Sequence, residues 1–180
     1  ICSSVLAGCA NHLQALKESV PDKSVLILEE SGFPVVVLAP LSQASDRHMR
    51  VFIEGDGRAW ITRSSPSLDP TPTKSFLVGL SQKEPGSAYM GRPCQYVLSE
   101  KCRVAYWTSH RFGREVLDSM SAALDALKAQ RGVESFELVG YSGGGAMALM
   151  LAGTRDDVRT VQTLAGNLAP AYWAASRNLT

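Results

Sequence analysis

The chain has 180 residues, of which 45% are hydrophobic and 19% charged, a composition that supports one substantial core and lies outside the range of disordered proteins. Lysine and arginine number 18 against 17 aspartate and glutamate residues, and the basic residues are scattered, which argues against nucleic acid as a partner. No run of eighteen apolar residues occurs, so no segment of the sequence has the pattern of a helix that spans a bilayer. One domain is expected.

The first nine residues, from Ile1 to Cys9, are mostly small and end in Leu-Ala-Gly-Cys. This ending resembles the lipobox of bacterial lipoproteins, in which the leader is removed before the cysteine and the cysteine then carries lipid. The resemblance implies that residues 1–8 are the remnant of a signal peptide and that Cys9 anchors the protein to a membrane surface in the bacterial cell envelope. Ala10 and Asn11 follow without an aspartate, which implies the outer membrane, facing the periplasm. The alternative is a buried N-terminal strand with an incidental cysteine.

Residues 9–23 are expected to form a tether or a short helix, because a weak helical period runs from His12 to Val20 and stops at Pro21. Beyond this segment, short aliphatic runs alternate with helical patterns, which predicts a mostly parallel sheet flanked by helices. The first two strands form a hairpin in this arrangement. The expected strands are Ser24–Glu29, Pro34–Pro40, Met49–Glu54, Ser87–Met90, Phe136–Val139 and Val158–Leu164. The expected helices are 74–80, 111–130 and the stretch after Ser142 through Leu151, and the residues from Ala171 onward are compatible with another helix.

The third of these strands leads into the loop Glu54-Gly55-Asp56-Gly57. Glycines let a backbone approach a ligand closely, and an ester hydrolase takes one oxyanion donor from the loop after an early strand. The alternative is a simple glycine turn with a solvated Asp56. A calcium loop would need more oxygen ligands than this loop offers. The polar, proline-rich stretch Arg63–Thr73 that follows is placed to line a substrate mouth.

Cys94 and Cys102 are near enough in the sequence to close a small loop. In an oxidising compartment they are candidates for a disulfide, and the alternative is two separate buried thiols. Neither belongs to a C-x-x-C pair and no histidine cluster accompanies them, so no zinc or other metal site is predicted.

The stretch from Glu137 to Leu149 passes from an apolar run through Gly-Tyr-Ser-Gly-Gly into small apolar residues, which predicts a strand, a sharp turn and a helix. Gly140 and Gly144 frame Ser142 at the G-x-S-x-G spacing of a nucleophile elbow, where side chains beside the strained serine would collide. The helix that follows would point its N-terminus at the serine, where it favours a developing negative charge. One alternative is a glycine-rich helix entry that Ser142 merely caps. A phosphate-binding loop is the other, but no Gly-Lys-Ser/Thr follows.

Four segments together resemble a family of bacterial α/β-hydrolase lipoproteins, and the similarity runs from about residue 22 to Trp173. These segments are Ile53–Trp60, Arg92–Tyr96, Tyr106–Thr108 and Gly140–Gly145. The resemblance implies the α/β-hydrolase fold and hydrolysis of small esters or related acyl compounds without a cofactor.

The same resemblance implies a role for three residues. Ser142 would be the nucleophile, the amide of Gly143 one oxyanion donor, and the amide of Asp56 the second. Glu54 stands where the lipase and esterase pattern has a histidine, which is a departure from that pattern.

A larger departure lies after Ser142. In the α/β-hydrolase fold the acid and the histidine follow the nucleophile in chain order, but here only Asp156 and Asp157 follow it, with no histidine. All three histidines precede the serine: His12, His48 and His110. Without a base, a serine hydroxyl is a weak nucleophile near neutral pH. The sequence therefore predicts the N-terminal part of a serine hydrolase, with 24–180 as an incomplete domain that lacks its C-terminal part. The alternative is a non-catalytic envelope lipoprotein that uses the fold as a binding or structural module.

Overall fold

The computed structural model describes residues 12–30, 32–42, 47–166 and 168. Cys9 and the stretch from Ala171 onward lie outside these residues, so the lipid anchor and the final helix stay predictions. Residues 12–19 form a helix, which is one of the two forms expected for that segment. The other elements, in chain order, are β1 (Lys23–Leu28), β2 (Val35–Pro40), β3 (His48–Ile53), α2 (Phe76–Lys83), β4 (Ala88–Met90), the 3₁₀ turn η1 (Val104–Trp107), α3 (Arg114–Arg131), β5 (Ser135–Tyr141), α4 (Gly143–Ala152) and β6 (Val158–Leu164).

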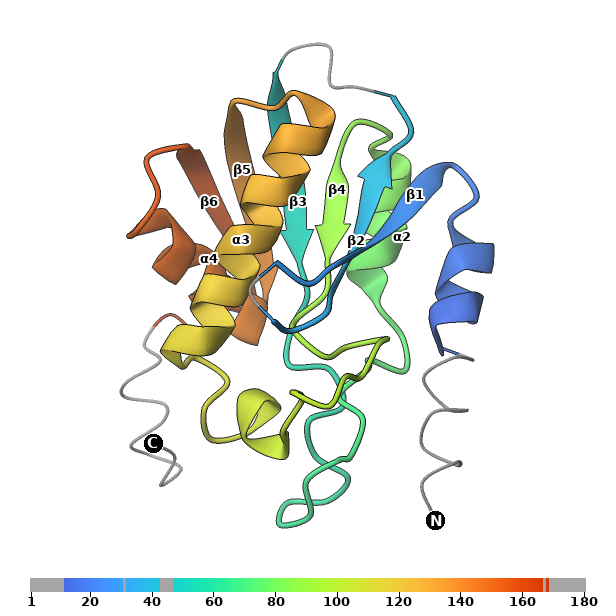
Figure 1. Cartoon of the computed structure of the whole chain (residues 1–180), viewed down its shortest axis with the longest axis vertical. Coiled ribbons are helices and arrows are strands. Elements are labelled where there is room, and N and C mark those ends of the chain that lie inside the picture. Colours follow the sequence, from blue (N-terminus) through green and yellow to red (C-terminus); the bar gives the residue numbers. More distant parts are fainter. Residues whose placement is uncertain (1–11, 31, 43–46, 167, 169–180) are drawn as a thin grey trace.

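The described strands form a single mixed sheet in the order β1-β2-β4-β3-β5-β6. β1 and β2 pair as the antiparallel hairpin that the sequence predicts, and β2 is also antiparallel to β4. The remaining neighbours, β4 with β3, β3 with β5 and β5 with β6, are parallel. The carboxyl ends of β3, β4 and β5 therefore meet at one edge, and the loops that follow β3 and β4 gather at that edge (Figure 1).

Helices cover both faces of this sheet, which is why β2 is a continuous apolar run rather than an alternating one. Every residue of β2 is buried. On one face, the core includes Met120 and Leu124 of α3 together with Met147 of α4. On the other face, Leu77 of α2 packs in the same cluster as Leu16 from the helix over residues 12–19. Figure 1 shows α3 crossing in front of the sheet, with α2 on the side behind it.

Two helices begin later than their sequence patterns predict. The helix expected from residue 74 begins at Phe76, because the Ser75 hydroxyl accepts a hydrogen bond from the Val78 amide (3.2 Å) and so caps it. The helix expected from residue 111 begins at Arg114 after an extended Gly113. It ends where predicted, at Gly132, which adopts the left-handed conformation (φ 67°) of a helix C-cap.

The described helices include none with the length and apolar character needed to cross a membrane.

Candidate active site

Ser142 lies at the turn between β5 and α4, at the edge where the parallel strands end. Its backbone has φ 51° and ψ −119°, a conformation that non-glycine residues rarely adopt and that persists only where the surroundings hold it. Two hydrogen bonds hold it here: the Ser142 amide donates to Leu164 O (3.0 Å) and the Gly145 amide donates to Ser142 O (3.0 Å). The serine side chain makes no capping hydrogen bond to α4. The arrangement is the predicted strand, sharp turn and helix, and the alternative in which Ser142 merely caps is not what the structure has.

The glycines that frame Ser142 are required by close packing. A Cβ atom on Gly140 would lie 2.5 Å from the carbonyl carbon of Gly144. A Cβ atom on Gly144 would lie 2.5 Å from the Glu54 carbonyl oxygen and closer still to that of Ile53. The first clash is within the turn, and the second is between the turn and the end of β3. The G-x-S-x-G spacing therefore brings the first turn of α4 directly onto the loop after β3.

The loop after β3, from Glu54 to Gly57, lies against Ser142. An added Cβ on Gly55 would be 3.4 Å from Ser142 Cβ, and one on Gly143 would be 2.7 Å from the carboxyl carbon of Asp56. The Gly143 amide is in the first turn of α4, where no intrahelical acceptor is available. The Asp56 amide has no acceptor among the described residues. The structure thus brings together Ser142, Gly143 and Asp56, the three residues named from the sequence.

Glu54 is a buried carboxylate beneath this loop. Its Oε1 accepts from the Gly55 amide (2.9 Å), and its Oε2 accepts from the Tyr89 hydroxyl (3.0 Å). Tyr89 and Tyr96 hydroxyls are also hydrogen-bonded to each other (3.0 Å). Burial raises the pKa of both tyrosines, so both stay protonated and able to donate at neutral pH. This network fixes the start of the loop, and no local pattern in the sequence indicates it.

The side chain of Asp56 is 25% exposed but is paired with cations, which corrects the alternative of a simple turn with a solvated Asp56. It faces two buried arginines, with Arg92 Nη1 3.2 Å from Oδ1 and Arg111 Nε 3.4 Å from Oδ2. Arg92 belonged to the family resemblance without a role, and Arg111 was expected to be the first residue of a helix. Both arginines lie in segments that are far from Asp56 in the sequence.

A cavity of about 390 Å³ opens at Ser142. Its described lining comes from the loop after β3, from Tyr141 and Ser142, and from the proline-rich loop through Pro72, Thr73 and Lys74. Part of the 63–73 stretch thus lines the mouth, as its position in the sequence indicates. Arg58 and Lys74 bring positive charge to the lining, and Trp60 adds an aromatic surface.

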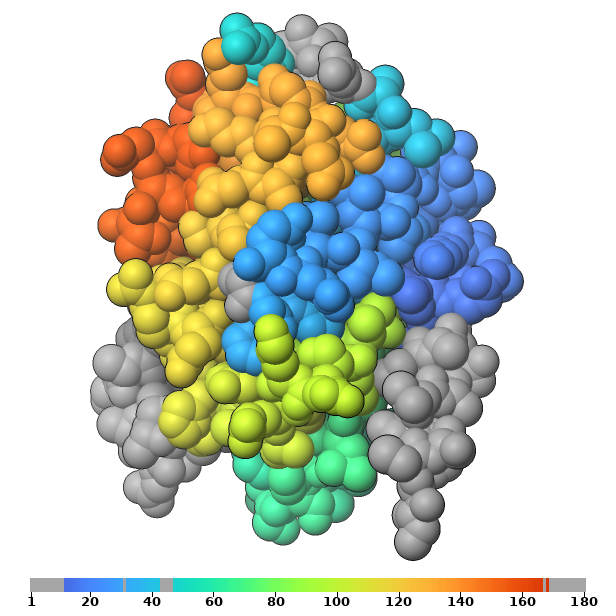
Figure 2. All heavy atoms as spheres, in the orientation of Figure 1, coloured from blue at the N-terminus to red at the C-terminus, as the bar shows by residue number. Residues whose placement is uncertain are grey.

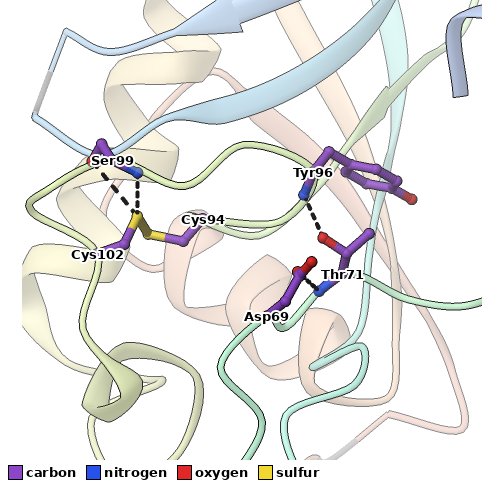
Figure 3. Close-up of a disulfide and its surroundings, with 6 residues drawn as sticks. All are labelled: Asp69, Thr71, Cys94, Tyr96, Ser99 and Cys102. Atoms are coloured by element: carbon purple, nitrogen blue, oxygen red, sulfur yellow. Dashed lines mark hydrogen bonds between the residues drawn. A yellow bond between two sulfur atoms is a disulfide. The ribbon is translucent and has the colours of Figure 1, made fainter. Parts of the chain in front are cut away.

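A disulfide joins Cys94 to Cys102, which is the first of the two alternatives that the sequence leaves open. Figure 3 shows it on the same segment as Tyr96, whose amide donates to Thr71 Oγ1 (2.7 Å). The Gln95 side chain on this segment donates to Gly55 O (3.0 Å). The segment after β4 is therefore tied to the loop after β3 and to the cavity wall, and Figure 2 shows the surfaces of residues 55–75 and 91–110 side by side at this end of the molecule.

No described histidine lines the cavity at Ser142. His48 is at the opposite edge of the sheet, where its Nδ1 lies 3.0 Å from Ser135 Oγ at the start of β5. His110 is exposed beside Ser109, and His12 Nδ1 lies 3.4 Å from Asp69 Oδ2. The described residues also include no cluster of three side chains that could hold a metal ion.

Asp157 lies at the edge of the sheet opposite Ser142, before β6 begins. Burial opposes its charge, but hydrogen bonds from Arg155 and Lys128 outweigh burial and hold its pKa below the usual range. Asp157 is thus an ionised partner of two cations. Neither it nor the adjacent Asp156 lines the Ser142 cavity.

The sequence matches no protein-family model and no curated protein. Solved structures do match at low identity. AbyA5 matches with a TM-score of 0.56 and 16% sequence identity, and the match covers 97% of this chain and 47% of AbyA5. Est1E from Butyrivibrio proteoclasticus matches with a TM-score of 0.51 and 16% identity, over 83% of this chain and 54% of Est1E. A membrane phospholipase A, a bacterial virulence factor, has 0.50 at 15%, over 91% and 46%.

These likenesses, with the six-stranded mixed sheet between helices, show that the chain has the α/β-hydrolase fold. The predicted fold class is confirmed. The chain spans about half the length of the solved structures that it matches.

Proposed function

We propose that this chain supplies the nucleophile and the oxyanion hole of a serine hydrolase that acts on small carboxylic esters or related acyl compounds. The observation that carries the proposal is the backbone conformation of Ser142, which has φ 51° at a strand-to-helix turn. The Ser142 side chain does not cap the helix, and the residue lines a cavity. Strain of this kind is concentrated at functional sites. The fold supports the proposal, because it is one on which this elbow carries nucleophilic serines.

The reaction follows from the groups around the cavity. Ser142 Oγ attacks the ester carbonyl carbon and loses its proton to a base, while the carbonyl oxygen takes the negative charge. The amides of Gly143 and Asp56 donate hydrogen bonds to that oxygen, and the N-terminus of α4 adds a favourable dipole. Collapse of the intermediate expels the alcohol, which takes up the proton. Water then attacks the acyl-serine and releases the acid.

The base and its acidic partner are proposed to come from residues that follow this sequence. In this fold they come later in the chain than the nucleophile, and the described histidines contribute nothing to the Ser142 cavity. The proposal is compatible with a chain that spans about half of the α/β hydrolases that it resembles.

Ester hydrolysis by the native-length protein tests this function. The substrates are p-nitrophenyl acetate, butyrate and octanoate, a series that also measures how much acyl chain the cavity accepts. Ser142→Ala should lower kcat by about 10⁴-fold or more, the scale seen when a triad serine is removed. Ser64→Ala, at an exposed loop serine, is the matched control and should keep wild-type activity. Unchanged hydrolysis by Ser142→Ala would overturn the assignment, and a native-length protein inert toward all three esters would favour the binding or structural module.

We also propose that Cys9 carries lipid and holds the protein in the bacterial envelope, at the outer membrane and facing the periplasm. The support is the Leu6-Ala7-Gly8-Cys9 ending and its resemblance to a lipobox. Labelled palmitate fed to the native host should be incorporated into the protein and lost in Cys9→Ala. Equal incorporation in both would contradict the anchor.

A further inference from the structure

The carboxylate of Asp56 is enclosed by two arginines from segments that are distant in the sequence. Arg92 follows β4 and Arg111 precedes α3. Each contacts a different carboxylate oxygen, at 3.2 Å and 3.4 Å, and the arginine side chains are only 5% and 4% exposed. A carboxylate that accepts a hydrogen bond from one buried arginine and forms an ion pair with a second through its other oxygen has little freedom to rotate.

The two arginines are themselves fixed. Arg92 Nη2 donates to the carbonyl oxygen of Arg111, and Arg111 Nη1 donates to Thr108 O (3.4 Å). Both guanidinium groups lie over the ring of Phe112, with their central carbons 5.7 Å and 4.9 Å from the ring centroid. Cation–π contacts of this kind favour the charged form in a buried setting. Burial lowers the pKa of the Arg92 guanidinium, but arginine starts from so high a value that it stays protonated at neutral pH.

The segment that bears Arg92 is anchored in the same way. Gln95 accepts from the Arg92 amide (2.9 Å) and donates to Gly55 O (3.0 Å), one residue before Asp56. The Cys94–Cys102 disulfide ties the segment to the chain ahead of η1. The segment that carries Arg92 is thus itself fixed by hydrogen bonds and a disulfide where Arg92 contacts Asp56.

The gripped carboxylate lies directly against the nucleophile elbow. An added Cβ on Gly143 would be 2.7 Å from the carboxyl carbon of Asp56 and 2.8 Å from Oδ2. The carboxylate of Asp56, one proposed oxyanion donor, therefore packs directly against the Cα atom of Gly143, the other.

We propose that Arg92 and Arg111 are positioning residues of the oxyanion hole, which fix Asp56 against Gly143 so that both amides aim at one substrate oxygen. This rests on the proposed function. It assigns the arginines no contact with substrate. Their effect passes through Asp56, which separates this role from that of an ion cluster that only stabilises the fold.

A double-mutant cycle in the native-length protein tests the role, with p-nitrophenyl butyrate as substrate. Arg92→Lys keeps a charge but loses the planar fork that matches a carboxylate. We expect kcat to fall about 10- to 100-fold, the scale of a misplaced catalytic group, with KM within about twofold of wild type. Asp56→Asn should likewise lower kcat about 10- to 100-fold and leave KM within about twofold of wild type. The double variant should be no slower than the slower single variant, because Arg92 acts through Asp56.

Arg155→Lys is the matched control. Its side chain is 9% exposed and its guanidinium also faces two carboxylates, Asp125 (2.6 Å) and Asp157 (2.8 Å), but it lies at the opposite end of the parallel strands. It should lose thermal stability and keep kcat. If Arg92→Lys does not fold, Arg111→Lys takes its place in the cycle, and Asp56→Asn by itself must still lower kcat.

Wild-type kcat in folded Arg92→Lys or in Asp56→Asn would overturn the proposal, as would losses in kcat that add in the double variant. Ser142→Ala separates this result from failure of the proposed function. If Ser142→Ala is inactive and the arginine variants are normal, only the positioning role is wrong. If Ser142→Ala hydrolyses the ester normally, the proposed function itself is wrong.

Discussion

Replacing Gly144 with alanine tests the contact that joins the two halves of the site. Gly144 is buried in the first turn of α4, with the carbonyl oxygens of Ile53 and Glu54 against its Cα atom. An added methyl group would lie 2.5 Å from the Glu54 oxygen, a distance that non-bonded atoms do not tolerate. The atoms it meets are backbone, so a side-chain rotation cannot relieve the clash. Either α4 or the end of β3 must move.

The free energy of this change has two parts of opposite sign. Overpacking a core costs about 1–3 kcal/mol, and the rigid backbone neighbours of Gly144 favour the upper end. Alanine in place of glycine in a helix contributes about 1 kcal/mol in the other direction. Gly144→Ala should therefore lose about 2 kcal/mol of unfolding free energy. In a domain of about 150–250 residues that corresponds to a melting temperature about 4–8 °C lower, and the shift is smaller in a longer chain.

Thermal melting and the rate of p-nitrophenyl butyrate hydrolysis measure the two consequences in the native-length protein. Gly79→Ala in α2 is the control, since no atom beyond its chain neighbours and its own helix backbone lies within 4 Å of its added Cβ, and it should gain about 0.5–1 kcal/mol from helix propensity. Gly144→Ala should also hydrolyse the ester more slowly, because the movement separates Asp56 from Gly143. A Gly144→Ala variant that melts as high as Gly79→Ala and keeps full activity would refute the close approach of α4 to β3.

Two further predictions concern the disulfide and a buried lysine. The cysteines are eight positions apart, and loop-closure entropy gives about 2.6 kcal/mol for a loop of this size. Cys94→Ser with Cys102→Ser should lower the urea midpoint accordingly, and an unchanged midpoint would show that the bond does not constrain the unfolded chain. Burial lowers the pKa of Lys23 to about 8, although Glu84 raises it, and its Nζ donates to Ser87 O (2.6 Å). The pKa of the unfolded lysine is ~10.4, so between these two pKa values the unfolded chain binds more protons than the folded chain, and the free energy of unfolding rises with pH. The free energy of unfolding of the wild type should therefore rise relative to Lys23→Met from pH 7.5 to 9.5, and a constant difference in urea titrations would contradict the shift.

Local sequence patterns predict much of the fold. The apolar run of β2, the stripe of α3 and the Gly132 stop each occupy a continuous stretch of sequence, and the structure has all three. The helix starts were less accurate because capping decides them. Ser75 moves one start by its own hydroxyl, and Gly113 moves the other. The sequence pattern marks where an apolar face exists, but the residue at the N-cap decides where the helix begins: a serine that accepts from an amide in α2, and an extended glycine in α3.

The candidate site likewise has a part that local sequence patterns predict and a part that they do not. Ser142 and its glycines form one short motif, which the sequence shows directly. The partners of Asp56 come from 36 positions away in Arg92 and from farther still in Arg111, and no local pattern records such a pairing. The signal that was available is that Arg92 sits between the apolar run of β4 and Cys94, where an uncompensated charge is costly and a buried acid must be found for it.

Covalent capture of Ser142 by a fluorophosphonate tests the central claim most directly. The probe reports nucleophilic attack itself, so it needs no knowledge of the natural substrate. Peptide mass spectrometry of the labelled native-length protein should find the phosphonate on Ser142, with no labelling of Ser142→Ala and normal labelling of Ser64→Ala. Labelling that survives in Ser142→Ala, or a native-length protein that folds and never labels, would contradict the assignment of Ser142 as the nucleophile.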